Sequence, residues 1–288
     1  MKFLLLLLPL IGCVSSQTSS FKVKGESNPW QLVWHDEFNG STLDLSKWSH
    51  EENCWGGGNN ELQCYTSRPK NSFVSNGHLY IVAYKEQYTG RAGQNGDGEP
   101  KTLPYTSARL RTKHKAEFKY GRICMRAKLP YGQGTWPAFW MLPTDSPYGG
   151  WSASGEIDIV ETVNISSDPN ADQDVHGTLW YGGQYPNQVS SSGHHSVSNP
   201  AFNFHEYCIE WDKNSFKWFV DNEFYQSKVD WWSEKGEGKA PFDTPFHILL
   251  NLAIGGDWPK SPDDSTIFPQ EFVIDYVRVF THKCRRSQ

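Results

Sequence analysis

The residues best suited to chemistry lie in one octet, Gly155–Thr162, which reads Gly-Glu-Ile-Asp-Ile-Val-Glu-Thr. Its β-branched residues favour a strand, whereas its three acids, Glu156, Asp158 and Glu161, are poor strand formers. Placing three like charges so close together destabilises a fold, which indicates a chemical role. The alternative is a solvated strand face. The aromatic-rich segment at 134–143, just before the octet, favours the chemical interpretation.

The relative orientation of these acids depends on the regularity of the strand. Because side chains alternate along a strand, Glu156 and Asp158 would share one face and Glu161 would lie on the other. A β-bulge near Ile159 and Val160 adds one residue and returns Glu161 to the shared face. We therefore predict a row of three carboxylates on one sheet surface.

Two neighbouring carboxylates suit the cleavage of glycosidic bonds, whose oxocarbenium-like transition state needs one protonated acid and one carboxylate. The two groups stand roughly 5–5.5 Å apart in retaining enzymes and about 6.5–9.5 Å apart in inverting ones, so close neighbours on one strand favour retention. We assign Glu156 as the nucleophile. Glu161 is then the acid/base, with a pKa raised by nearby charge and desolvation. Asp158 lies between them and is expected to hydrogen-bond Glu156. On the residues alone, the two glutamate roles could be exchanged.

Composition favours one large all-β domain. The chain has 288 residues, 15% of them aromatic, with 13 Trp and 25 Gly, and β-sandwiches of this size are commonly single units. A net charge of −5 argues against nucleic acid or an anionic membrane as a partner. Abundant Trp and Tyr are typical of carbohydrate binding, although over half of the tryptophans are expected in the core. We expect a monomer that binds a polysaccharide.

The N-terminus has the pattern of an exported protein. Residues 1–16 form a predicted secretory signal peptide, with Lys2, a short apolar run and a small-residue cleavage site. Residues 17–28 are a short polar linker, and 29–284 are one catalytic domain. A lipoprotein-like box ending at Cys13 is the competing interpretation and would tether the protein to a membrane. Ordinary secretion to the extracellular space is favoured.

Export makes disulfides expected. Apart from Cys13, the chain has five cysteines, so at least one stays unpaired. Cys54 and Cys64 bracket a Gly-rich loop and are the best pair by proximity. Zinc is disfavoured because no short Cys-x-x-Cys or Cys-x-x-His spacing occurs.

The rest of the chain consists of short apolar runs broken by turn residues, without βαβ spacing. This pattern predicts an all-β jelly-roll sandwich of two antiparallel sheets with a concave substrate cleft. Residues 88–104 read as a surface loop, and 229–235 are the one candidate for a short helix. The expected strands are 78–83, 121–129, 156–162, 207–212, 216–220, 246–253 and 272–280.

Several motifs in matching order make the chain resemble glycoside hydrolase family 16, specifically its laminarinase-like endo-1,3-β-glucanases. The resemblance covers roughly residues 30–281. The motifs are Trp34-His35-Asp36-Glu37-Phe38, Asn59-Asn60-Glu61-Leu62-Gln63, 134–143, 155–162, His176-Gly177-Thr178, Gly255-Gly256-Asp257-Trp258-Pro259 and 268–280.

This resemblance implies a jelly roll whose concave sheet holds an extended glucan, and a retaining mechanism. The two residues between Asp158 and Glu161 match the bulged version of the family's acidic motif. By resemblance, Glu156 is the nucleophile, Asp158 its helper and Glu161 the acid/base. The tryptophans matching cleft positions are Trp136, Trp140 and Trp151 near the cleaved bond and Trp258 farther along.

The resemblance also implies three polar contacts to sugar, from Asn60, Arg109 and His176. Arg109 and His176 could instead be strand-end residues whose partners are all within the protein. Core packing competes with a sugar-facing role for Trp140.

Catalysis requires no cofactor in this scheme. The resemblance does imply a structural calcium ion on the convex side, held by the Asp275 carboxylate and by backbone oxygens near Glu37 and Gly77, a type of ligand set that calcium accepts. The alternative is an Asp275 that makes only local hydrogen bonds.

The function implied is secreted, retaining endo-hydrolysis of 1,3-β-glucan such as laminarin, by double displacement. A non-catalytic β-glucan recognition protein is the alternative from another class, and such proteins typically lose the acids. A family enzyme that acts on mixed-linkage glucan, agar or carrageenan, or that transglycosylates, would share the same carboxylates.

Overall fold

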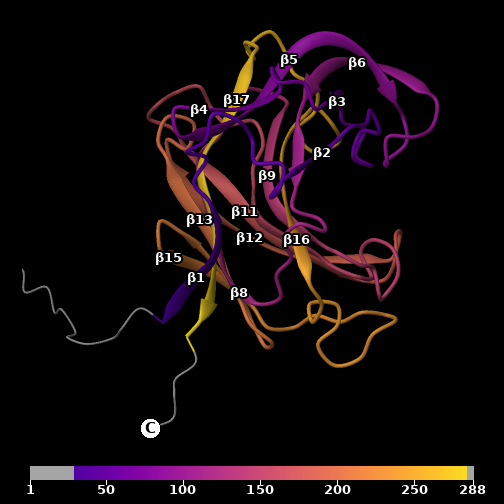
Figure 1. The fold of residues 1–288 in the computed structure, drawn as a ribbon, viewed down its shortest axis with the longest axis vertical. Helices are drawn as coiled ribbons and strands as arrows, with labels where there is room; N and C mark the ends of the chain where they lie inside the picture. Colours follow the sequence, from indigo (N-terminus) through magenta and orange to yellow (C-terminus); the bar gives the residue numbers. More distant parts are fainter. Residues whose placement is uncertain (1–28, 284–288) are drawn as a thin grey trace, which may run out of the picture.

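The computed structural model describes residues 29–283, and within this range all regular structure is β (Figure 1). The predicted signal peptide and linker, with Cys13 and Cys284, lie outside the described residues. None of the described residues forms a helix long and apolar enough to cross a membrane.

Two sheets pack face to face, which confirms the predicted sandwich. The ten-stranded sheet runs β15 (Glu223–Lys228), β14 (Phe216–Val220), β13 (His205–Trp211), β8 (Gly121–Lys128), β17 (Gln270–His282), β5 (His78–Arg91), β6 (Pro100–Ser107), β3 (Gln63–Tyr65), with β1 (Trp30–Asp36) beside β17 and β4 (Ser72–Ser75) beside β5. The seven-stranded sheet runs β12 (Gln188–Ser198), β11 (Asp172–Gly182), β10 (Glu156–Glu161), β9 (Thr135–Pro143), β16 (Phe246–Ile254), β7 (Arg109–Arg111), β2 (Ser49–Glu51). Neighbouring strands are antiparallel except β3 and β6.

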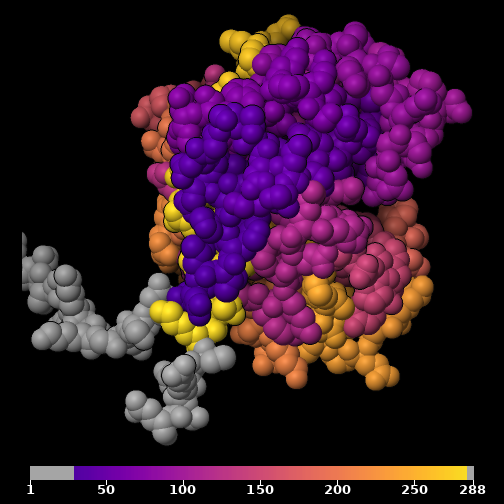
Figure 2. Space-filling model, viewed as in Figure 1, coloured from indigo at the N-terminus to yellow at the C-terminus, as the bar shows by residue number. Residues whose placement is uncertain are grey.

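The core lies between the sheets and is dominated by aromatic and branched side chains. Trp211, Phe216 and Trp218 from the larger sheet are at most 2% exposed, as are Ile157 and Ile159 from the smaller one. The space-filling view shows the surface hollowed at its right edge, between the purple part of the chain and the pink and orange part (Figure 2).

Two local predictions were wrong. The stretch at 88–104 is loop only at 92–99, because β5 continues to Arg91 and β6 begins at Pro100. The last eight residues of β5 alternate between half-buried and exposed, so this part of the strand lacks the apolar pattern of a core strand. The stretch at 229–235 is not a helix. Its backbone pairs with the end of β11 instead, and Trp231 is buried in the core.

Two disulfides link the described cysteines. Cys54–Cys64 is the pair expected from the sequence. Cys124 and Cys208 form the second bridge, from positions directly opposite each other on β8 and β13. These bridges use four of the five cysteines counted from the sequence, and the fifth, Cys284, lies outside the described residues.

The two bridges should differ in their contribution to stability, because a disulfide acts mainly by restricting the unfolded chain. The loop-closure relation gives about 4–5 kcal/mol for Cys124–Cys208 and about 2–3 kcal/mol for Cys54–Cys64. Their sequence separations are 84 and 10 residues. Denaturant unfolding of the Cys124→Ser/Cys208→Ser and Cys54→Ser/Cys64→Ser variants should show the larger loss for the first, and the reverse order would contradict this account.

Candidate active site

The acidic octet forms β10, at the centre of the seven-stranded sheet, and the strand carries the predicted bulge. On β11, Thr178 pairs with Asp158 and His176 pairs with Glu161. Two steps along β11 therefore match three steps along β10, so β10 contains one extra residue. The pairing with β9 shifts at the same place, between Asp158 and Val160.

The bulge divides the side chains of β10 between two faces. Ile157, Ile159 and Val160 are at most 2% exposed and pack in the core. Glu156 and Glu161 are half-buried on the other face. The predicted row of acids on one surface is confirmed by the contacts that the three carboxylates share.

Each carboxylate accepts a hydrogen bond from a different indole N–H. Trp151 Nε1 donates to Glu156 Oε2 at 2.9 Å, and Trp136 Nε1 donates to Glu161 Oε1 at 2.9 Å. The third donor is Trp180, whose Nε1 lies 3.1 Å from Asp158 Oδ2. These donors come from three different segments, so the orientation of the carboxylates depends on the tertiary structure.

Asp158 contacts Glu161 through a carboxyl–carboxyl hydrogen bond, which differs from the expected contact with Glu156. The extra residue of the bulge turns Glu161 back toward Asp158. This interaction raises the pKa of Asp158 and lowers that of Glu161.

All three acids have raised pKa values. Burial is the main cause in each case, and it raises the pKa of Glu156 to about 8 and that of Glu161 to about 7. Burial followed by the charges of Glu161 and Glu156 raises the pKa of Asp158 well above its usual range. The cluster therefore retains protons near neutral pH, and protonated and ionised carboxyls can coexist there.

Aromatic rings surround the Glu161 end of the row. Trp258 is 40% exposed, and its ring lies edge-on to both Trp136 and His176, with centroids 5.3 Å apart in each case. His176 is half-buried, and burial lowers its pKa, so its ring is neutral at neutral pH. A neutral ring can both donate and accept hydrogen bonds, as a contact to sugar hydroxyls requires.

Arg109 lies deeper than a direct sugar contact would need, whereas Trp140 is half-buried to the same degree as Trp136. The Arg109 guanidinium is buried, lies 4.5 Å from the Tyr65 ring centroid and pairs with Glu51 at 3.5 Å. Its positive charge lowers the pKa of Glu156, so it acts on the site electrostatically. Trp140 is half-buried, and its Nε1 donates to Asn251 Oδ1 at 2.7 Å.

Asn60 lies at a separate part of the rim. Its Nδ2 donates to both carboxylate oxygens of Asp257, at 3.1 and 3.2 Å. The two residues help to line a hollow of about 260 Å³. Asp257 lines this hollow and directly precedes Trp258, so the hollow adjoins the aromatic end of the site.

Three residues important to this geometry were not selected from the sequence. Trp180 orients Asp158, Trp218 donates its Nε1 to the Asp158 carbonyl at 2.9 Å, and Glu61, 4% exposed, raises the pKa of Glu161. Trp180 could have been found, because alternation along β11 places it on the same face as His176. Trp218 comes from a distant segment without such a signal, whereas Glu61 lies within the motif at 59–63 that contributed to the family resemblance.

The segments predicted to hold calcium converge. Asp36 pairs with Val277 on β17 and Leu79 pairs with Ile274, so the following Glu37 and the preceding Gly77 both lie near Asp275. Asp275 Oδ2 accepts a hydrogen bond from Arg126 Nη1 at 2.6 Å, and the Glu37 carboxylate pairs with Arg278 at 2.7 Å. One carboxylate and several carbonyl oxygens are ligands that calcium accepts. A calcium ion here would share the Asp275 carboxylate with the Arg126 guanidinium.

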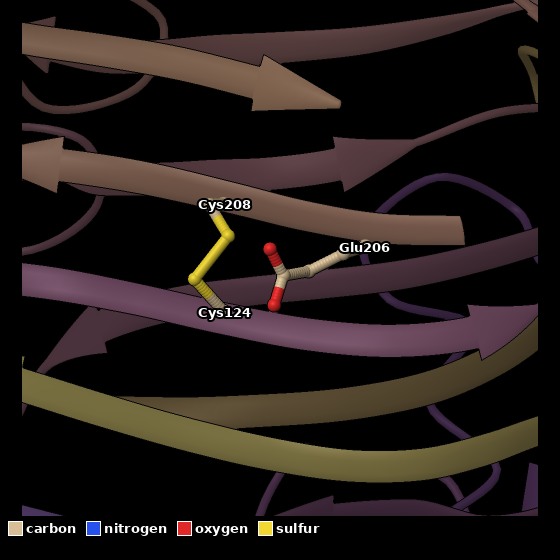
Figure 3. Close-up of side chains that lie close together, drawn as sticks. All are labelled: Cys124, Glu206 and Cys208. Carbon is tan, nitrogen blue, oxygen red and sulfur yellow. A yellow bond between two sulfur atoms is a disulfide. The ribbon is translucent and has the colours of Figure 1, made fainter. Parts of the chain in front are cut away.

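A second cluster, Cys124, Cys208 and Glu206, has side-chain ligand atoms close together (Figure 3). The two sulfurs are bonded to each other, so neither is a thiolate that could bind a metal ion.

The raised pKa values also predict a pH-dependent stability. Unfolded glutamates ionise near about pH 4.3, so between about pH 4 and 8 the folded cluster binds more protons than the unfolded chain. The stability that Glu156 and Glu161 contribute should therefore fall as pH rises through this range. Glu156→Gln should reduce that fall by on the order of 1 kcal/mol, measured by urea unfolding at pH 4 and pH 8. The exposed Glu223→Gln is the control, and equal pH profiles for both variants would contradict the prediction.

Comparison with known proteins agrees with this geometry. The sequence matches the family described as glycosyl hydrolases family 16 over residues 58–278. It is 40% identical to a beta-glucanase of Rhodothermus marinus, an alignment that covers 96% of this chain and 92% of that protein. It is 41% identical to glucan endo-1,3-beta-glucosidase A1 of Niallia circulans over 86% of this chain, but spans only 37% of that longer protein.

The fold is also similar to a solved structure, the laminarinase catalytic domain from Thermotoga maritima. The TM-score is 0.74 at 37% identity, covering 89% of this chain and all of that one. The family match and these relatives, together with the bulged acidic strand in a two-sheet sandwich, show that the chain belongs to glycoside hydrolase family 16.

Proposed function

We propose that this protein is a secreted endo-hydrolase of 1,3-β-glucan that acts by a retaining, double-displacement mechanism. The observation that carries the proposal is the row of three carboxylates, each oriented by its own indole, beside half-exposed aromatic rings. Partly exposed tryptophans offer flat apolar surfaces to the C–H faces of sugars. Secretion rests on the predicted signal peptide at 1–16.

In the first step, the Glu156 carboxylate attacks the anomeric carbon and forms a glycosyl ester. The glycosidic C–O bond breaks, and Glu161 gives its proton to the departing oxygen. In the second step, Glu161 takes a proton from water while the water oxygen attacks the same carbon, which releases Glu156. Two inversions leave the anomeric configuration unchanged.

The neighbouring groups act on both outer glutamates. Burial raises the pKa of Glu156 to about 8 and that of Glu161 to about 7, and the Arg109 charge offsets only part of the rise for Glu156, so the two roles rest on the family resemblance and not on the order of the pKa values. The Trp151 indole N–H holds Glu156 in one orientation, which reduces the freedom lost at the transition state. Asp158 is a positioning residue for Glu161 through their shared hydrogen bond.

Specificity for 1,3-linked glucan rests on the relatives named above as glucan endo-1,3-beta-glucosidase and laminarinase. Mixed-linkage glucan, agar or carrageenan as substrate would use the same acids and differ in the cleft contacts. Product profiles on these polysaccharides, with NMR of the fresh product anomer, distinguish the substrates and test retention. A protein that binds laminarin but releases no reducing ends would be a recognition protein instead.

The two glutamate roles predict different effects of substitution. Glu156→Gln should lower kcat on laminarin about 10³-fold or more while the glucan still binds, because the amide cannot form the ester. Glu161→Ala should slow poor leaving groups most, and azide should partly restore activity on activated aryl glycosides. Reducing-end assays and affinity electrophoresis measure these effects. Azide rescue of Glu156→Gln instead of Glu161→Ala would exchange the roles.

We also propose a structural calcium ion at the Asp275 carboxylate and the backbone near Glu37 and Gly77. It would connect β1, the β4–β5 turn and β17, and it would not take part in bond cleavage. Millimolar CaCl₂ added after chelation should raise Tm by a few degrees in the wild type and not in Asp275→Asn. The exposed Asp264→Asn should respond like the wild type. An equal Tm with calcium and with chelator in the wild type would remove the ion from the proposal.

A further inference from the structure

Two histidines lie directly opposite each other beside the carboxylate row. On β11, His176 pairs with Glu161 of β10 on one side and with His194 of β12 on the other. Residues directly opposite each other on antiparallel strands share a face of the sheet, so Glu161, His176 and His194 form one row across three strands. β12 is an edge strand of this sheet, and His194 is exposed to solvent.

Ring contacts agree with this placement of both imidazoles. The Trp258 ring centroid lies 5.3 Å from that of His176 and equally far from that of Trp136. Trp136 in turn donates its Nε1 to Glu161, so these three rings lie beside that carboxylate. The His176 and His194 ring centroids are 6.0 Å apart, with the rings tilted by 49°. The second imidazole therefore lies on the same side of the sheet as the first.

The chemistry of this pair suits a transition-metal ion. Within residues 29–283, no hydrogen bond occupies the nitrogens of either ring. A ligand nitrogen stands about 2.0–2.1 Å from zinc, and each imidazole nitrogen lies at the rim of its ring, so one ion between rings at this separation can reach a nitrogen of each. Neutral imidazole is the form that binds metal, and burial favours the neutral form of His176 by lowering its pKa.

Charge and access near the pair also favour a cation. Asp174 precedes His176 by two residues on β11, so the two side chains share a face, and Asp174 is exposed. Its negative charge reaches His176, whose pKa it raises against the larger lowering by burial. The exposed side of the pair leaves room for water to complete the coordination of an ion. Imidazole is a ligand that zinc, copper and nickel accept, whereas calcium and magnesium prefer oxygen.

We propose that His176 and His194 together bind a divalent transition-metal ion, Zn²⁺, Cu²⁺ or Ni²⁺, and that the bound ion inhibits the enzyme. The ion occupies the nitrogen that His176 would offer to a sugar hydroxyl, and its water ligands fill the space beside the Trp258 ring. Inhibition is therefore competitive with the glucan and raises KM more than it lowers kcat. The metal site rests on the geometry of the pair alone, whereas its inhibitory effect rests on the proposed function.

The kinetic test titrates laminarin hydrolysis with ZnCl₂ in His194→Ala and in His195→Ala. His195 is the matched control, because its ring points to the other face and stacks on Tyr225 with centroids 5.3 Å apart. Without metal, His194→Ala should keep the wild-type kcat/KM. The inhibition constant of zinc should rise about tenfold or more in His194→Ala and stay at the wild-type value in His195→Ala. Thermal unfolding verifies that both variants fold.

Calorimetric titration with ZnCl₂ measures binding without depending on hydrolysis, and excess CaCl₂ in the buffer keeps oxygen-ligand sites filled. The wild type and His195→Ala should bind an additional ion compared with His194→Ala. If the wild type does not hydrolyse laminarin, the proposed function fails, while this difference in stoichiometry still supports the metal site. Equal stoichiometry in the three proteins, or zinc binding at this pair without inhibition of an active enzyme, overturns the proposal.

Discussion

The active site depends on one irregularity, the extra residue in β10 between Asp158 and Glu161. A bulge interrupts the ladder of backbone hydrogen bonds, and a buried carbonyl without a partner is costly. Here the Trp218 indole crosses from the other sheet and donates to the Asp158 carbonyl. Trp218 can approach because Gly177 has no side chain: a Cβ there would lie 2.4 Å from the indole. The glycine of the His-Gly-Thr motif and a core tryptophan thus support the bulge together.

A second constraint follows from placing three acids on one half-buried surface. Burial and mutual repulsion raise their pKa values, which lowers stability as pH rises but provides the proton that acid catalysis needs. The three indole donors offset part of this cost without adding charge. The buried guanidinium of Arg109 adds a positive charge that lowers the pKa of Glu156 and offsets part of the rise caused by burial. Both outer glutamates therefore keep raised pKa values, and the cluster as a whole holds the proton that the reaction uses.

The same rigid segments that hold the carboxylates also present aromatic rings to the surface. Trp136 and Trp151 each use the indole N–H to orient an acid, while Trp151 and Trp258 expose part of their rings. One sheet face can therefore support both bond cleavage and binding of an extended chain.

The sequence by itself determined the all-β class, the Cys54–Cys64 pair and the bulge in β10, because these depend on local patterning. Three acids at 156, 158 and 161 can share a face only if one residue is inserted between them. The tertiary structure decided which groups contact those acids. Trp180 and Trp218 reach Asp158 from β11 and β14, and Asp158 turned out to hydrogen-bond Glu161. The polar extension of β5 and the non-helical segment near Trp232 were mispredicted because pairing with distant strands outweighs local propensity. Such contacts join residues far apart in the chain, and no periodicity in the sequence encodes them.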